Sequence, residues 1–158
     1  MNQSGMTAHR PKLLAISSGG GHWIQLLRLR PAFEGSTVTY ATVRDGYRND
    51  LDPGDGFRVI PDANRWSKLR MLRSAISIAW LLLRLHPDVV VTTGAAPGYF
   101  ALCIGKLLGA RVVWIDSIAN AGELSMSGRN AGAFADLWLT QWPHLERDGG
   151  PQCLGSVL

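Results

Sequence analysis

The chain has 158 residues, of which 46% are hydrophobic and 18% are charged, and its net charge is +4 at pH 7. This composition excludes an intrinsically disordered protein, and the length suits one domain with a hydrophobic core but not two large domains. Sixteen basic residues against twelve acidic ones favour an anionic partner. Because the arginines are scattered and no aromatic-and-basic binding signature accompanies them, we do not expect that partner to be nucleic acid.

The cysteines, the N-terminal segment and the apolar stretches bear on the cellular compartment. Cys103 and Cys153 are fifty residues apart, and neither has the spacing of metal ligands. This pattern indicates a reduced, cytoplasmic protein. Residues 1–11 are polar and lack the apolar core of a signal peptide, so we expect a disordered N-terminal segment there. No apolar stretch reaches the roughly 18 residues that a membrane-spanning helix needs.

The predicted elements in the first half begin with a short buried strand at 12–17 (KLLAIS). Residues 22–30 have the apolar spacing of a helix that Pro31 closes. Residues 36–43 (STVTYATV) are rich in β-branched side chains and predict a second strand. A polar loop follows, and a short third strand is predicted at 57–60 (FRVI).

The second half of the chain continues the alternation of helices and strands. In chain order, the pattern predicts a long helix at 66–85, a β-branched strand at 88–93, a helix within 94–110, and strands at 111–116 and 137–141. Strands that alternate with helices in this way predict an α/β fold with a mainly parallel sheet. We expect residues 12–158 to form this sheet and its helices as a single domain.

The stretch SSGGGH at 17–22 joins the first predicted strand to the first predicted helix. Such a turn presents free backbone N–H groups at the positive end of a helix dipole, and glycines remove the Cβ atoms that would keep a ligand away. It suits phosphate, pyrophosphate or a sugar hydroxyl. Because ligands collect at the carboxyl ends of parallel strands, the turns at 92–98 and 115–122 are expected to converge on the same crevice.

Known phosphate-binding motifs fit the glycine turn poorly. No Lys-Ser or Lys-Thr pair follows the glycines, which argues against a P-loop, and Ile24 stands where the dinucleotide fingerprint needs its third glycine. Asp45, near the end of the second predicted strand, does stand where a ribose-binding acid would be. A nucleotide-binding oxidoreductase is therefore kept as an alternative hypothesis.

His22 is placed directly after the glycines. A lone histidine at such a position commonly caps the helix or bonds a loop carbonyl. A neutral imidazole at the exit of a glycine turn can also accept a proton from a bound hydroxyl group, which makes His22 a candidate general base.

Four segments match a known family in order and spacing: SSGGGH, TTGAAPGYFALCIGKLLGA, WIDSIANAGELSMSGR, and LTQWPHL with CLG after it. Together they resemble the bacterial PssD-type subunits of polysaccharide biosynthesis. That family is similar to the membrane-anchoring subunit of the endoplasmic-reticulum enzyme that adds the second GlcNAc to dolichol-linked sugar. It is more distantly similar to the N-terminal half of MurG. The resemblance covers roughly residues 12–155.

The resemblance implies a split GT-B glycosyltransferase. This chain would supply the acceptor-side half, a Rossmann-like parallel sheet with helices on both faces, and a separate small protein would bind the nucleotide sugar. The acceptor would be a saccharide on a polyprenyl diphosphate carrier, and neither a cofactor nor a metal ion is implied. The alternative within this family is a non-catalytic scaffold that recruits and activates the donor-binding subunit.

Matched position by position, the resemblance also implies site residues. His22 and Asp116 are the two candidates for the base that deprotonates the acceptor hydroxyl. Asp116 stands where relatives commonly carry glutamate, and it has two alternative roles: orienting the acceptor sugar, or capping the turn after its strand. The implied acceptor-binding residues are Ser18, Gly19, Gly20, Gly21, Gly94, Ser117, Ser125, Ser127, Gly128 and Arg129.

The predicted helix at 66–85 combines basic residues with leucine, isoleucine and tryptophan. A helix of this composition can pack on the sheet as an ordinary crossover and can also lie in a membrane interface, where anionic lipids attract its cations. We expect no counterpart of the N-terminal anchor that eukaryotic relatives carry. The sequence therefore predicts peripheral association with the cytoplasmic face of the inner (cell) membrane.

Overall fold

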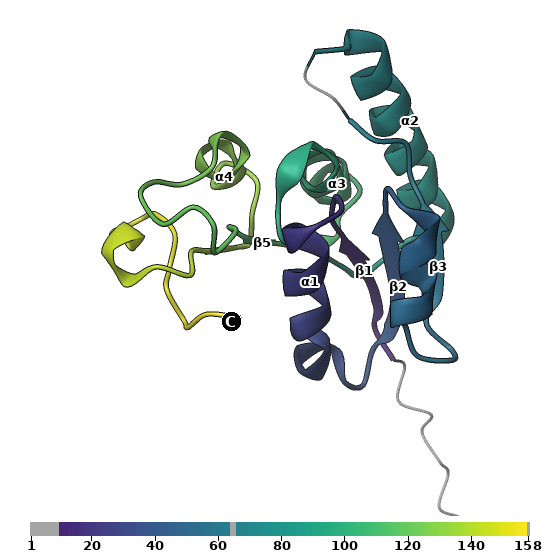
Figure 1. Cartoon of the computed structure of the whole chain (residues 1–158), viewed down its shortest axis with the longest axis horizontal. Coiled ribbons are helices and arrows are strands. Elements are labelled where there is room, and N and C mark those ends of the chain that lie inside the picture. The colour runs from purple at the N-terminus through teal and green to yellow at the C-terminus, as the bar shows by residue number, and fades with distance from the viewer. Residues whose placement is uncertain (1–9, 64–65, 158) are drawn as a thin grey trace, which may run out of the picture.

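The computed structural model describes residues 10–63 and 66–157, and within them six parallel strands form one sheet in the order β3-β2-β1-β4-β5-β6 (Figure 1). The strands are β1 (Lys12–Ile16), β2 (Thr37–Thr42), β3 (Gly56–Val59), β4 (Val89–Thr92), β5 (Arg111–Ile115) and β6 (Leu137–Leu139). The helices are α1 (Gly21–Arg28), α2 (Lys68–Leu85), α3 (Ala95–Leu107) and α4 (Met126–Ala131), with 3-10 segments η1 (Arg30–Phe33), η2 (Asp45–Asp50) and η3 (Pro143–Leu145). The prediction of an α/β fold with a parallel sheet is confirmed.

Two hydrophobic clusters cover the two faces of the sheet. Trp23 and Leu26 of α1 pack with strand residues on one face, together with Phe33 of η1. Ile78 of α2 and Leu102 of α3 pack with strand residues on the other face. The sheet is therefore the middle of three layers, which is why its central strands are apolar on both sides.

The strand order places a topological switch point between β1 and β4. The chain leaves β1 toward β2 on one side and leaves β4 toward β5 on the other, while Ala15 of β1 lies beside Val91 of β4. The loops that follow these two strands therefore run apart and leave a crevice at the carboxyl edge of the sheet, where α/β proteins bind their ligands.

Helix α3 lies close to β4 because glycines face the strand. A Cβ atom at Gly98 would lie 2.0 Å from Thr92 Oγ1, and one at Gly105 would lie 3.0 Å from Val90 Cγ2. Both positions therefore need glycine for packing rather than for an unusual backbone angle. This close approach fixes the start of α3, and with it the second turn of the crevice.

A surface ion pair between Lys106 and Asp136 links the end of α3 to the segment just before β6. Asp136 pairs with Lys106 and accepts a hydrogen bond of 2.8 Å from Val112 N. The bond from Lys106, followed by the bond from Val112 N, lowers the pKa of the Asp136 carboxyl below its ordinary value. The pair ties α3 to the β5–β6 region from outside the core.

The boundaries of several elements differ from the predicted ones. The long helix begins at Lys68 rather than at residue 66, because Ser67 is its N-cap and accepts a 3.4 Å hydrogen bond from Arg70 N. Helix α4 and the three 3-10 segments were not predicted, since each is too short to show an apolar period. Most of the predicted disordered segment 1–11 lies outside the described residues, although Pro11 O accepts a hydrogen bond from Thr37 N.

Candidate active site

A cavity of about 560 Å³ lies at the carboxyl edge of the sheet. Its walls come from the starts of α1, α2, α3 and α4 and from the chain after β5; they include His22, Met71, Tyr99, Ser117, Asn120 and Met126. The three turns that the sequence predicts to converge do meet around this crevice. The cavity combines an apolar side with hydroxyl, amide and imidazole groups, as small-molecule sites usually do.

The glycine turn at the start of α1 is held by Tyr47 of η2. Gly20 has a φ of 67°, which favours glycine, and its N–H donates a 2.9 Å hydrogen bond to Tyr47 Oη. A Cβ atom at Gly19 would lie 3.3 Å from the same oxygen. Trp23 N and Ile24 N donate to Gly20 O and start the helix. The bare backbone thus accommodates Tyr47, and His22 of the same turn lines the crevice.

His22 is fixed by the turn after β4. Its Nδ1 lies 2.8 Å from Thr93 O, and Thr93 Oγ1 donates a 2.7 Å hydrogen bond to His22 O. Because a carbonyl oxygen only accepts, Nδ1 carries the hydrogen, and in the neutral form of the ring the lone pair is therefore on Nε2. Gly94, with a φ of 116°, makes room: a Cβ atom there would lie 3.2 Å from His22 Cε1. The ring therefore has one defined tautomer on the cavity wall.

Asp116 follows β5 and is 1% exposed. Its carboxylate accepts four hydrogen bonds, from Ser125 Oγ at 2.6 Å, Ser125 N at 2.9 Å, and Asn120 Nδ2 and Trp114 Nε1 at 3.3 Å each. A Cβ atom at Gly128 would lie 2.5 Å from Asp116 Oδ1. The carboxylate is thus occupied in closing the loop that leads to α4.

The other predicted residues of this loop have unlike surroundings. Ser125 Oγ accepts a 2.8 Å hydrogen bond from Gly128 N and caps α4, while Ser127 is half-buried on the cavity wall. Arg129 is exposed and pairs with Glu123 at 2.9 Å. The structure therefore brings His22, Ser117, Ser125 and Ser127 together around the cavity, and it leaves Arg129 outside the cavity lining.

Two buried glutamines beneath the site were not predicted. Gln25 of α1 and Gln141 after β6 are each 5% exposed and bond to each other at 2.8 Å. They join the glycine turn to the loop after β5. The sequence does show Gln25 within an otherwise apolar helical face, which hints at a buried polar contact. Its partners Ser117 and Gln141 could not be identified, because they are 92 and 116 positions away in the chain.

Tyr99 is a further polar group on the cavity wall. Burial raises the pKa of its phenol, and the nearby Cys103 thiol raises it further. Burial also raises the pKa of the Cys103 thiol. Both groups therefore stay protonated near neutral pH. Throughout residues 10–63 and 66–157, no group of three or more His, Cys, Asp or Glu side chains is arranged to hold a metal ion.

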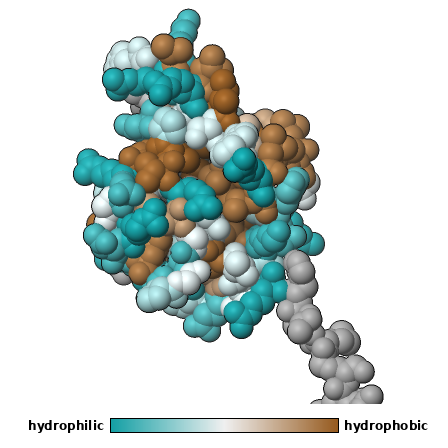
Figure 2. Space-filling model, turned by 90° about the vertical axis from the view of Figure 1, so that its right-hand side faces the viewer, coloured by the Kyte–Doolittle hydropathy of each residue, from teal (hydrophilic) through white to brown (hydrophobic). Residues whose placement is uncertain are grey.

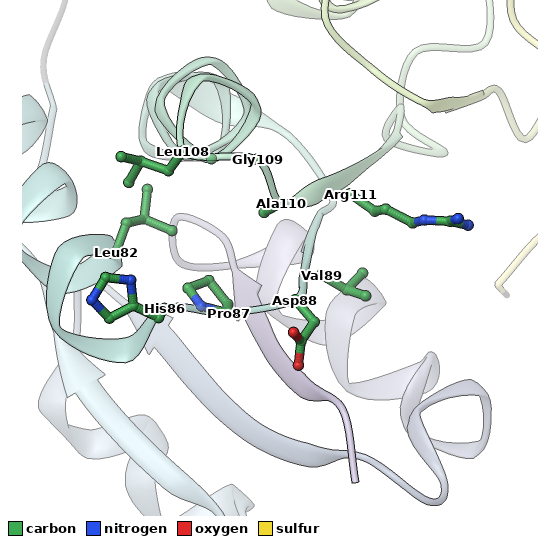
Figure 3. A pocket seen from close by; sticks show the side chains of 10 residues that line it. Leu82, His86, Pro87, Asp88, Val89, Leu108, Gly109, Ala110 and Arg111 are labelled. Carbon is green, nitrogen blue, oxygen red and sulfur yellow. The ribbon is translucent and has the colours of Figure 1, made fainter. Parts of the chain in front are cut away.

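A second cavity, of about 570 Å³, lies at the opposite edge, where β4 and β5 begin (Figure 3). Its charged side chains diverge: His86, Asp88 and Arg111 point in three different directions from an apolar centre. Asp88 is already bonded to Lys12 N at 2.8 Å. Because no polar groups converge there, this cavity is a poorer candidate for a ligand site than the crevice.

Comparison with known proteins gives matches in both sequence and structure. The family described as "Oligosaccharide biosynthesis protein Alg14 like" matches residues 57–153. Relatives described as "UDP-N-acetylglucosamine transferase subunit ALG14" are 30% identical in Eremothecium gossypii and 26% identical in Yarrowia lipolytica; each alignment covers 85% of this chain and 75% of the relative.

Among solved structures, Acinetobacter baumannii MurG superposes with a TM-score of 0.73 at 15% identity, over 94% of this chain and 46% of MurG. A putative UDP-N-acetylglucosamine 2-epimerase from Listeria monocytogenes superposes with a TM-score of 0.62 at 17% identity, over 84% of this chain and 39% of the epimerase. These similarities show the fold, which is that of GT-B glycosyltransferases such as MurG. This chain spans less than half the length of either solved structure.

Proposed function

Because this chain belongs to the Alg14-like family of oligosaccharide biosynthesis proteins, we propose that it is the acceptor-binding, membrane-associating subunit of a two-component glycosyltransferase. A second chain would hold the donor-binding half and deliver a sugar from a nucleotide sugar. The acceptor would be a saccharide on a polyprenyl diphosphate. The physiological setting that we propose is bacterial polysaccharide biosynthesis of the PssD type.

One observation supports an acceptor-side role most directly. The His22 ring, with Nδ1 bonded to Thr93 O, lies on the wall of a cavity at the switch point of the sheet. A general base must reach the hydroxyl group that it deprotonates, and this ring is the basic group in the crevice whose proton-accepting atom is uncommitted within the described residues. The carboxylate of Asp116, in contrast, accepts four hydrogen bonds from its own loop.

The proposed reaction is a displacement at the anomeric carbon of the nucleotide sugar. The acceptor oxygen forms the new glycosidic bond, and its proton passes to His22 Nε2. The bond between the anomeric carbon and the diphosphate oxygen breaks, and the nucleoside diphosphate leaves with the electron pair. We assign stabilisation of that leaving group to the partner chain, and to Asp116 the task of holding the loop of Ser117 and Ser125 in place.

The remaining acceptor contacts are those that the family resemblance implies, and of these residues Ser117, Ser125 and Ser127 line the cavity. We propose that Ser18, Gly19, Gly20, Gly21 and Gly94 form the backbone side of the acceptor site, and that Ser117, Ser125, Ser127 and Gly128 form the opposite side. Arg129 would meet the carrier diphosphate. To do so it must exchange its surface partner Glu123 for the phosphate oxygens.

The membrane-facing surface that we propose is the outer side of α2, which extends beyond the sheet in Figure 1. Apolar side chains recur along it at helical spacing, each more than half exposed: Leu69, Leu72, Ile76, Trp80 and Leu83. Lys68, Arg70, Arg73 and Arg84 are exposed on the same helix. Figure 2, which views this side, shows apolar surface between hydrophilic side chains. Such a helix suits an anionic membrane interface, and Met71 of the same helix lines the cavity.

Within the described residues, no helix is both long enough and apolar enough to cross a bilayer. The exposed apolar and basic side chains of α2 support our proposal of peripheral association with the cytoplasmic face of the cell membrane. Changing both Leu72 and Ile76 to glutamate should weaken binding to vesicles that contain phosphatidylglycerol by at least about tenfold, since it removes two exposed apolar side chains that would insert into the lipid interface. Sedimentation with vesicles measures this.

Leu107→Glu is the matched control for the vesicle experiment. Leu107 is 82% exposed at the end of α3, outside the α2 surface, so this variant should bind vesicles like the wild type. The membrane proposal is wrong if the wild-type chain does not bind anionic vesicles, or if Leu107→Glu loses as much vesicle binding as the α2 variant.

The proposed function is tested by reconstitution. The chain would be co-expressed with a donor-binding GT-B half and assayed on phytanyl-diphosphate-linked N-acetylglucosamine with a panel of nucleotide sugars, beginning with UDP-N-acetylglucosamine. We expect transfer only when both chains are present. Full-rate turnover by this chain alone in detergent-free buffer would contradict the proposal. Tight binding of a nicotinamide cofactor would instead favour the oxidoreductase alternative.

A further inference from the structure

A directional chain of hydrogen bonds runs beneath the cavity. Val157 N donates to Gln141 Oε1 at 2.9 Å, and Gln141 Nε2 donates to Gln25 Oε1 at 2.8 Å. Gln25 Nε2 then donates to Ser117 Oγ at 3.0 Å. Gln25, Gln141 and Ser117 are each 5% exposed, so these bonds are shielded from water.

Backbone groups fix the orientation of both amides. Ile118 N donates to Gln25 Oε1 at 3.0 Å, and Gly21 O accepts from Gln25 Nε2 at 3.2 Å. At Gln141, Asp116 O accepts from Nε2 at 2.9 Å, while Val157 N donates to Oε1. A backbone N–H only donates and a carbonyl only accepts, so neither amide can be turned over without losing bonds on both sides.

This order has a consequence for the Ser117 hydroxyl. Its oxygen accepts from Gln25 Nε2 and from Ala119 N at 3.3 Å, which occupies both of its lone pairs. Its own hydrogen finds no acceptor among residues 10–63 and 66–157. Ser117 lines the cavity, so that hydrogen is available to a ligand there.

We propose that Gln25 and Gln141 are positioning residues that commit Ser117 to donating a hydrogen bond to an oxygen atom of the bound acceptor. This inference rests on the proposed function, because it names a contact within the same site. A ligand oxygen that accepts is favoured at this point, and a ligand N–H is disfavoured because it would meet an oxygen with no remaining lone pair.

The test is a double-mutant cycle on the assembled two-chain enzyme, with phytanyl-diphosphate-linked N-acetylglucosamine as the acceptor. Ser117→Ala should raise the acceptor KM by about 3- to 10-fold and leave kcat nearly unchanged, as expected for the loss of one hydrogen bond. Gln25→Glu should raise KM similarly, because a carboxylate cannot donate to Ser117 and takes its hydrogen instead. The double variant should show no further rise.

Gln152→Glu is the matched control, since it makes the same chemical change at an exposed glutamine and should leave KM unaltered. The inference would be overturned if the rise in KM of the double variant equalled the product of the rises in the two single variants. An unchanged KM in Ser117→Ala would overturn it as well.

A second measurement needs no ligand. In the full chain alone, Ser117→Ala should accelerate amide hydrogen exchange at Ala119, whose N–H loses its acceptor, but not at Ile118, which keeps Gln25 Oε1. Equal amide exchange rates at Ala119 in the wild type and in Ser117→Ala would overturn the inference, even if the wild-type pair transfers sugar. Absent transfer by the wild-type pair would instead count against the proposed function, and exchange would still decide whether the network is as described.

Discussion

Replacing His22 with alanine should lower sugar transfer by the assembled two-chain enzyme by about 10²- to 10⁴-fold, the range expected for loss of a general base. The variant should lower kcat rather than raise the acceptor KM. The imidazole accepts the proton that moves during bond formation, and it does not bind the carrier lipid. The variant should still assemble with the partner chain. Steady-state kinetics with a saturating nucleotide sugar, together with size-exclusion chromatography of the pair, measure both properties.

The control for this experiment is His86→Asn. His86 is exposed at the opposite edge of the sheet and has a φ of 44°, a conformation that asparagine tolerates well. Its variant should retain full transfer. If His22→Ala keeps both assembly and transfer, the chain is a scaffold and the partner holds all of the chemistry.

A second large effect is expected at Gly98, where alanine should destabilise the fold by about 3 kcal/mol. Its Cβ atom would lie 2.0 Å from Thr92 Oγ1, and Thr92 is fully buried in β4, so α3 must move away from the sheet. For a chain of this size we expect the Tm to fall by roughly 6 to 12 °C. Thermal unfolding followed by circular dichroism measures the change.

Two further variants make the Gly98 result interpretable. Gly122→Ala adds a methyl group at a glycine with nothing within 4 Å, and it should change stability by no more than about 0.5 kcal/mol. Adding Thr92→Ala to Gly98→Ala should restore part of the loss, since it removes the atom that clashes. An unchanged Tm for Gly98→Ala would mean that α3 does not lie as close to β4 as described.

The fold was predictable because its signals are local. The β-branched run at 89–92 lies in the centre of a sheet that is buried on both faces, and the glycines at 19–21 lead into a helix whose apolar residues recur at helical spacing. The turns after three strands also followed from these patterns, because all parallel strands end at one edge. The crevice could therefore be placed from sequence before any side chain was positioned.

The hydrogen bonds within the site could not be predicted, because they join residues that are distant in the sequence or lie in loops without a distinctive pattern. Sequence left Asp116 with three roles: general base, orientation of the acceptor sugar, or capping of the turn after its strand. In the structure, four hydrogen bonds occupy its carboxylate. Tyr47, which holds the glycine turn, lies in a polar loop that predicts nothing but a turn. The amide pair of Gln25 and Gln141 joins positions that are 116 residues apart. Such pairs become visible only once the sheet has brought its loops together.

The position of β1 at the centre of the sheet has a consequence for how the protein is made. Leu13 of β1 pairs with Val89 of β4, 76 positions further along the chain. At about 5 to 20 residues per second, a ribosome takes on the order of 4 to 15 s to synthesise that interval. During this time one edge of β1 has no neighbour, and an unpaired strand edge is a site of aggregation. We therefore expect the nascent chain to be most prone to aggregation before β4 has emerged from the ribosome.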